Sequence, residues 1–172
     1  MPEFAVLSPK KVTWREWLGL AAGLLALAAL FLPWTTLTAS RPEIEDVLAT
    51  LPADDVTRDA WRSGFLAWAP VFLVFLPGLA VVLFGRVDAV RRAGLPHLWL
   101  MAAIGALLLM LLGRLSLDWQ FDADQRGILS AAGVEIGSGL GRYLGLLAAV
   151  VSVVVAFLDV RRLRAETRTR RP

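Results

Sequence analysis

The chain has 172 residues, of which 57% are hydrophobic, and its mean hydropathy is +0.62. Soluble domains carry roughly 45 to 50% apolar residues, so this excess excludes an ordinary soluble protein and predicts a single membrane domain over residues 1–172. The net charge is +3 and cysteine is absent, which excludes disulfides, thiol nucleophiles, iron–sulfur clusters and thiolate metal sites.

Four apolar stretches without a charged side chain are the predicted membrane spans. A helix needs about 17 to 25 residues to cross the hydrocarbon core. We therefore predict an all-α membrane protein with a four-transmembrane-helix bundle, whose spans cover residues 17–36, 64–85, 97–113 and 143–158. The first stretch follows Lys10 and Lys11, as in a secretory signal. Because Leu37 stands three residues before a possible cleavage at Ala39, where signal peptidase prefers a small residue, we expect this helix to be retained.

The distribution of Lys and Arg predicts the orientation. Twelve of the eighteen basic residues precede the first stretch, join the second to the third, or follow the fourth. Cytoplasmic segments retain Lys and Arg during insertion. Both termini are therefore predicted to lie in the cytoplasm of a bacterial plasma membrane, with residues 37–63 and 114–142 outside. Ten of the fifteen acidic residues fall on these two outer connections, which makes the outer surface net negative.

Aromatic residues and the basic tail are predicted to lie at the lipid headgroups. Trp and Tyr rings prefer the headgroup level, where an apolar ring and a polar tip are both accommodated. The residues assigned to this belt are Trp14, Trp17 and Trp99 at the inner ends and Trp34, Trp61 and Tyr143 at the outer ends. The tail over residues 159–172 is predicted to attract anionic headgroups through Arg161, Arg162 and Arg164. Alternatively, the tail only fixes the topology and stays disordered.

The outer connections are longer than plain loops and are predicted to fold into a small cap. After Pro42, apolar residues recur at helical spacing, which predicts a short amphipathic helix that ends at Pro52. Residues 115–121 and 134–136 alternate between apolar and polar types, the period of a half-buried strand. The Thr-rich segment 34–38 could supply a third strand to the same sheet. The apolar positions of the short helix are Ile44, Val47, Leu48 and Leu51.

Small residues spaced four apart predict close helix contacts, because they let helix backbones approach in lipid. The series in the last span comprises Gly137, Gly141, Gly145, Ala149, Ser152 and Ala156, and the first span carries Gly19 and Gly23. These two faces could pack on each other or receive a helix of a partner protein. Pro70 and Pro77 lie seven residues apart in the second span and predict a kink there.

No catalytic, cofactor or metal site is predicted. Proton relays and ion coupling need a charged residue inside a span, and the four stretches contain none. Haem held by two histidines of one chain is excluded because His97 is the only histidine. The outer carboxylates Asp54, Asp55 and Asp59 match no calcium loop and predict a solvated acidic surface.

Short motifs near the ends of the spans carry a resemblance. Leu32, Pro33 and Trp34 close the first stretch, residues 61–64 precede the second, and glycines lead into the fourth. In these features the chain resembles a group of small four-span actinobacterial membrane proteins whose functions are mostly unassigned. The likeness covers most of the chain, and sixteen arginines against two lysines agree with a GC-rich source. The topology is also distantly similar to that of claudins, without their paired cysteines and their Gly-Leu-Trp motif.

The chain combines helix faces of small residues with a folded cap and has no recognisable set of catalytic residues. This combination predicts a non-enzymatic scaffold or accessory subunit of a larger plasma-membrane complex. The resemblance implies an envelope transporter or a respiratory assembly as the host. The expected partners are membrane lipids and an integral membrane protein or a second copy of the chain, with no nucleic acid. The alternatives are a small oligomeric channel or lipid carrier and, third, an enzyme whose groups would lie among the outer carboxylates, to be tested by alanine replacements at Asp54, Asp55 and Asp118.

Overall fold

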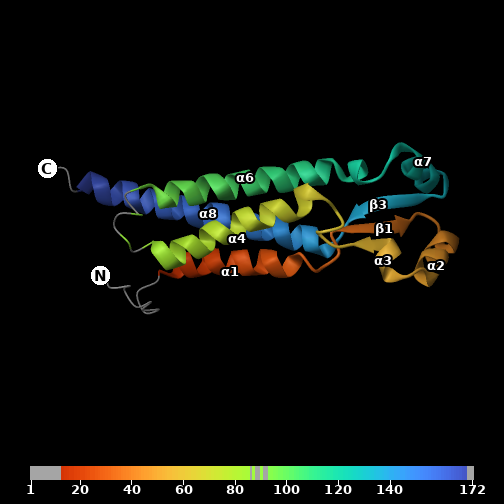
Figure 1. The fold of residues 1–172 in the computed structure, drawn as a ribbon, viewed down its shortest axis with the longest axis horizontal. Helices are drawn as coiled ribbons and strands as arrows, with labels where there is room; N and C mark the ends of the chain where they lie inside the picture. Colours follow the sequence, from red (N-terminus) through yellow and green to blue (C-terminus); the bar gives the residue numbers. More distant parts are fainter. Residues whose placement is uncertain (1–12, 86, 88–89, 91–92, 170–172) are drawn as a thin grey trace, which may run out of the picture.

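A computed structural model describes residues 13–85, 87, 90 and 93–169. Four long helices lie side by side, and short helices and strands form a cap at one end of them (Figure 1). The long helices are α1 (Trp14–Ala29), α4 (Phe65–Phe84), α6 (Leu95–Leu115) and α8 (Leu140–Thr169). Within the described residues, three segments are long and apolar enough to cross a membrane, which supports a membrane protein; these are Phe65–Phe84, Leu95–Leu115 and Leu140–Ala165.

Helix α1 is shorter than the predicted first span. It begins at a capping box, in which Thr13 and Glu16 each accept a hydrogen bond from the backbone N–H of the other. It has 16 residues and ends at Ala29, after which the N–H groups of residues 30–32 bond to carbonyls only three residues back. Pro33 explains this end, because proline cannot continue a helix and restricts the residue before it. The prediction of helix over 17–36 is therefore wrong beyond Ala29.

The cap contains a three-stranded sheet of β1 (Thr35–Ala39), β2 (Thr57–Arg58) and β3 (Val134–Ser138) in the order β2-β1-β3. Both pairs are antiparallel, and Thr35 lies opposite Arg58 on one side and Ser138 on the other. The predicted strands at 34–38 and 134–136 are confirmed. Because β1 follows α1 and β3 precedes α8, the sheet joins these two helices at one end.

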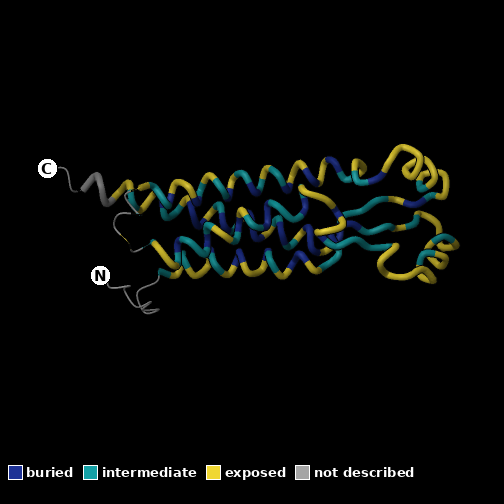
Figure 2. The backbone as a smooth tube through the Cα atoms, in the orientation of Figure 1, coloured by how far each residue is buried: buried dark blue, intermediate teal, exposed yellow. Residues whose placement is uncertain are grey.

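Four short helices complete the cap: α2 (Pro42–Thr50), α3 (Ala53–Val56), the 3-10 helix η2 (Leu117–Gln120) and α7 (Ala123–Ala131). The short helix predicted after Pro42 is confirmed. The strand predicted over 115–121 is wrong, because α6 continues to Leu115 and η2 follows over Leu117–Gln120; the Ser116 N–H and hydroxyl both donate to the Leu112 carbonyl and so extend helical bonding to the end of α6. Neither α2 nor α7 buries a residue, and Figure 2 shows both as largely exposed.

The long helices contact one another in a ring: α1 packs on α4 and α8, and α6 packs on the same two helices. Helices α1 and α4 approach closely with glycine on both sides, since a Cβ on Gly78 would lie 3.0 Å from the Gly19 carbonyl oxygen. Gly23 lies against the backbone of Phe75, where a Cβ would come within 2.9 Å. The small residues of the first span therefore pack inside the chain, with Gly23 against Phe75 of α4 and Gly19 against the Trp99 ring of α6.

Pro70 and Pro77 both lie inside α4, which continues as one helix from Phe65 to Phe84. The kink remains a prediction. Gly137 lies in β3 opposite Thr36, so its assignment to the helical small-residue series is wrong. The rest of that series lies in α8, where Gly141, Gly145, Ala149, Ser152 and Ala156 are all buried.

Candidate functional site

The region where the helices meet the cap is built around Trp34, whose side chain is only 1% exposed. Its indole Nε1 donates to the Ala29 carbonyl at 2.6 Å, in the last turn of α1. The ring fills a notch in α8, where a Cβ on Gly141 would lie 2.6 Å from two ring atoms and one on Gly145 would lie 3.0 Å from a third. The glycine spacing in α8 therefore accommodates the Trp34 ring, and at Gly141 also the end of α1, since a Cβ there would lie 2.8 Å from the Ala29 carbonyl oxygen.

Arg142 is buried beside Trp34. Its Nε donates to the Trp34 carbonyl at 3.2 Å, its Nη1 donates to the Gly113 carbonyl, and its Cζ lies 5.8 Å from the centre of the Trp34 ring. Gly113 stands in the last turn of α6, where carbonyls lack a partner within the helix. Arg142 thus satisfies the end of α6 while fixing the start of α8 to the chain that leads into β1. The sequence placed Arg142 in an outer connection and gave no sign of its burial.

A small network of polar side chains lies beneath the sheet. The buried Thr35 hydroxyl lies 3.1 Å from the Ser63 hydroxyl and donates to Gln120 Oε1 at 3.0 Å. The Arg58 guanidinium sits 4.3 Å from the centre of the Phe121 ring. We call this region the junction, and we define it as Trp34, Thr35, Ser63, Gly113, Gln120, Gly141 and Arg142. It connects α1, the sheet, η2, α6 and α8, and the sequence analysis identified none of its hydrogen bonds.

Trp99 occupies a similar notch near the other end of the helices. Its side chain is 0% exposed, its Nε1 donates to the Ser152 hydroxyl at 3.1 Å, and its ring would collide with any Cβ on Gly19. The headgroup assignment is therefore wrong for Trp34 and Trp99, because glycines on neighbouring helices admit both rings and their N–H groups find partners inside the protein.

The other belt residues present their rings at the surface. Trp14, Trp17, Trp61 and Tyr143 are exposed, and Trp61 stacks on Trp68 with ring centres 6.0 Å apart. Arg161, Arg162 and Arg164 are also exposed, near the end of α8. Their places at the headgroups remain predictions.

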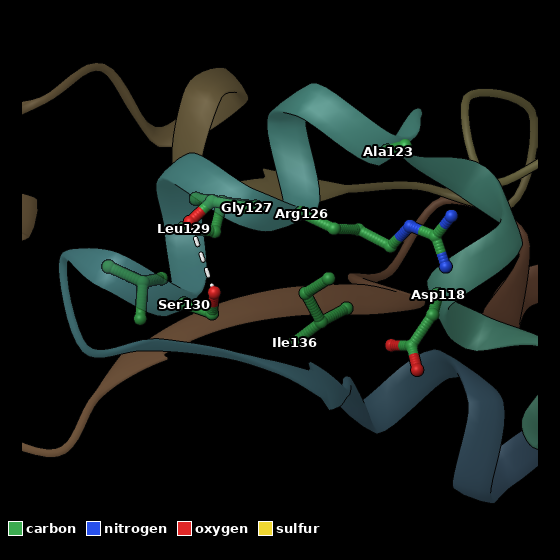
Figure 3. Close-up of a pocket in the computed structure, with 8 residues that line it drawn as sticks. Asp118, Ala123, Arg126, Gly127, Leu129, Ser130 and Ile136 are labelled. Atoms are coloured by element: carbon green, nitrogen blue, oxygen red, sulfur yellow. Dashed lines mark hydrogen bonds between the residues drawn. The ribbon is translucent and has the colours of Figure 1, made fainter.

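A hollow of about 400 Å³ opens on the outside of the cap between α7, η2 and β3. Figure 3 shows Arg126 and Asp118 at one end of it, with Ile136 below α7. Its volume falls within the roughly 300 to 1,000 Å³ of small-molecule sites. The Ser130 hydroxyl donates to the Gly127 carbonyl at 3.0 Å, and none of the eight lining residues is a histidine or lysine that could activate it. The charged side chains that line the hollow are Asp118 and Arg126.

The outer carboxylates do not gather. Asp54 and Asp55 are exposed on α3, whereas Asp118 is exposed on η2. Among the described residues there is no group of three or more His, Asp or Glu that could hold a metal ion. The residues proposed for an enzymatic alternative thus lie on separate elements of the cap.

The junction is buried where the long helices meet the cap, whereas the hollow is open on the surface of the cap. The chain matches no protein-family model, no curated protein and no solved structure.

Proposed function

We propose that the protein is a non-enzymatic integral membrane scaffold or accessory subunit of a larger plasma-membrane complex. The observation that carries this proposal is the exposed apolar surface of the cap. Ile128 on α7 is 70% exposed and Trp119 on η2 is 78% exposed, and Val47 and Leu51 are exposed at α2. Helices α2 and α7 flank the sheet and are held on either side of it (Figure 1). Exposed apolar surface marks protein interaction sites where it is contiguous, and the proposal is that a partner covers these side chains on either side of the sheet.

The proposed topology has all four long helices crossing the membrane, with both termini in the cytoplasm and the cap outside. Helix α1 begins and α8 ends at the end of the helices opposite to the sheet (Figure 1). At 1.5 Å per residue, α1 supplies about 24 Å of a hydrocarbon core of roughly 30 Å. The exposed ring of Phe31 just beyond it extends the apolar surface toward the cap. The arginines at the end of α8, Arg161, Arg162 and Arg164, are proposed to contact anionic inner headgroups.

The absence of cysteine makes this topology directly testable. Ser130→Cys places a single thiol on α7, and Arg164→Cys places one in the basic tail; both positions are exposed. In intact cells, a membrane-impermeant thiol reagent should label the first variant, and it should label the second only after the membrane is opened. Labelling of the tail variant in intact cells would contradict the proposed orientation.

Binding to a partner is tested by purification from the source membrane in a gentle detergent, followed by native mass measurement. A membrane protein partner should copurify in a fixed ratio. Ile128→Ser should reduce its yield, whereas Ala131→Ser, which introduces the same side chain at another exposed position of α7, should not. Repeated recovery of the protein alone, or only as its own oligomer, would overturn the scaffold proposal.

The channel or lipid-carrier alternative is limited by the packed interior. Trp34, Trp99 and Met110 are buried among the long helices, so a pathway would have to run between copies rather than through one chain. Purified protein in vesicles tests this alternative. Ion or lipid movement above that of protein-free vesicles would favour it over the scaffold.

A further inference from the structure

Two arginines meet at the corner where α6 ends and α8 begins. Arg114 lies in the last turn of α6 and is exposed, whereas Arg142 lies in the first turn of α8 and is 2% exposed. Arg142 donates to the carbonyl of Gly113, the residue before Arg114, and the Cζ of Arg114 lies 5.6 Å from the ring centre of Tyr143, the residue after Arg142, so two like charges lie at one corner. Such a pair is unfavourable unless something of opposite charge lies nearby.

The contacts of this pair are neutral groups. Arg142 donates to two backbone carbonyls and lies against the Trp34 ring. Arg114 donates to the Ser138 hydroxyl, and its Cζ lies 5.6 Å from the centre of the Tyr143 ring. These groups satisfy N–H donors but carry no negative charge to balance the two guanidinium groups.

The helix dipoles do not balance the corner either. The C-terminal end of α6 carries a partial negative charge and the N-terminal end of α8 carries a partial positive one, each of about half an elementary charge. The hydrogen bond from Arg142 to Gly113 brings the two helix ends together, so their partial charges offset each other. Two full positive charges remain at the corner.

We propose that this corner, Arg114 with Arg142 behind it, binds the phosphate of a phospholipid in the outer leaflet. Guanidinium groups bind phosphate oxygens through paired N–H donors, and this contact strengthens where water is sparse. The exposed side chains beside the two arginines are apolar or aromatic, namely Leu115, Leu140 and Tyr143. Such a surface fits acyl chains and a glycerol backbone better than a freely dissolved phosphate.

The proposal rests on the membrane topology given above, which puts this corner at the outer headgroups. It differs from the lipid contact proposed for Arg161, Arg162 and Arg164, because those residues lie at the other end of α8. It needs no partner protein, so the scaffold proposal can fail while this one stands, and the thiol-labelling experiment reports separately on the topology.

The test is native mass measurement of the full-length protein released from mild detergent, after addition of phosphatidylglycerol or of diacylglycerol with the same acyl chains. The wild type should retain phosphatidylglycerol in preference to diacylglycerol. Arg114→Gln should lower that retention about fivefold, as expected for one arginine near a lipid surface. Arg62→Gln removes another exposed arginine just before α4, also at the outer end of the helices, and should leave retention unchanged.

Three results would overturn the proposal. Equal retention of diacylglycerol would show that the acyl chains alone bind. An equal loss in Arg62→Gln would show that any outer arginine contributes. Displacement of phosphatidylglycerol by an equal concentration of inorganic phosphate would identify a site for free phosphate instead of lipid. Arg114→Lys keeps the charge but loses the paired donors, and it should therefore fall between the wild type and Arg114→Gln.

Discussion

The junction and the cap helices α2 and α7 lie at the same end of the molecule but use their side chains in opposite ways. The junction buries a tryptophan, an arginine and a threonine and satisfies each through hydrogen bonds. The cap helices bury nothing and hold apolar side chains outward. Under the scaffold proposal, the junction fixes where the cap sits, and α2 and α7 supply the exposed surface for a partner. Substitutions in the two regions should therefore differ sharply in their effect on stability.

The largest loss is expected for Trp34→Ala, which removes a buried ring and its hydrogen bond to the Ala29 carbonyl. A cavity of this kind costs about 3 to 5 kcal/mol of unfolding free energy. Titration with sodium dodecyl sulfate in mixed micelles measures the change. Trp119→Ala removes an equally large ring from η2, where it is exposed, and should cost far less. Equal losses in the two variants would remove the distinction between junction and cap.

The same glycine-to-alanine change at the junction and in the cap should have opposite effects on stability. Gly141→Ala places a methyl group 2.6 Å from the Trp34 ring, and overpacking of this kind costs about 1 to 3 kcal/mol. Gly127→Ala in α7 meets no atom within 4 Å, and alanine favours a helix over glycine by about 0.5 to 1 kcal/mol. The same change should therefore destabilise at the junction and stabilise in the cap, in the same micelle titration. Stabilisation by both changes would show that the Trp34 notch is not tightly packed.

Removal of one hydroxyl should have a smaller effect. Thr35→Val keeps the shape of the side chain but deprives Ser63 and Gln120 of their shared partner, which costs about 1 to 2 kcal/mol. Thr50→Val removes a hydroxyl that bonds to the Val47 carbonyl on exposed α2 and serves as the control. A larger loss in Thr50→Val than in Thr35→Val would contradict the assigned role of the junction network.

The smallest effect is expected for Ile128→Ser, because its side chain on α7 is 70% exposed. Exposed substitutions of this kind change the unfolding free energy by no more than about 0.5 kcal/mol. A thermal melt of the purified protein should thus be unchanged, even though the same variant is expected to lose its partner. A strongly lowered melting temperature would mean that loss of the partner reflects unfolding rather than loss of a contact.

Local patterns in the sequence predicted several elements of the fold. The alternation at Val134 to Ile136 and the Thr-rich segment after Trp34 predicted the two main strands, and Pro42 marked the start of α2. Helix α7 was missed although its start carries a recognisable signal, the capping box of Asp122 and Gln125. The alternation over 115–121 misled because two of its apolar members, Leu115 and Trp119, are exposed rather than buried.

The burial of Trp34 and Trp99 could not be predicted from the residues near them in the sequence. A tryptophan near the end of a span usually lies at the headgroups, and that expectation changes only when the facing residue is known. Here Gly141 and Gly145 face Trp34 from more than 100 positions away, and Gly19 faces Trp99 from another helix. The glycine spacing predicted close packing in α8, but it did not identify the ring that fills the space. Arg142 is a similar case, because its partners on α6 and before β1 are brought together only by the fold.

The direct pairing of β1 with β3 has a mechanical consequence. Only a short turn separates β1 from α1, and Gly139 alone separates β3 from α8. The paired strands therefore connect these two helices directly. A force applied to the cap from outside would tilt α1 and α8 together. The far ends of these helices carry the capping box of Thr13 and the exposed arginines, so a tilt that starts at the cap would move both of these ends.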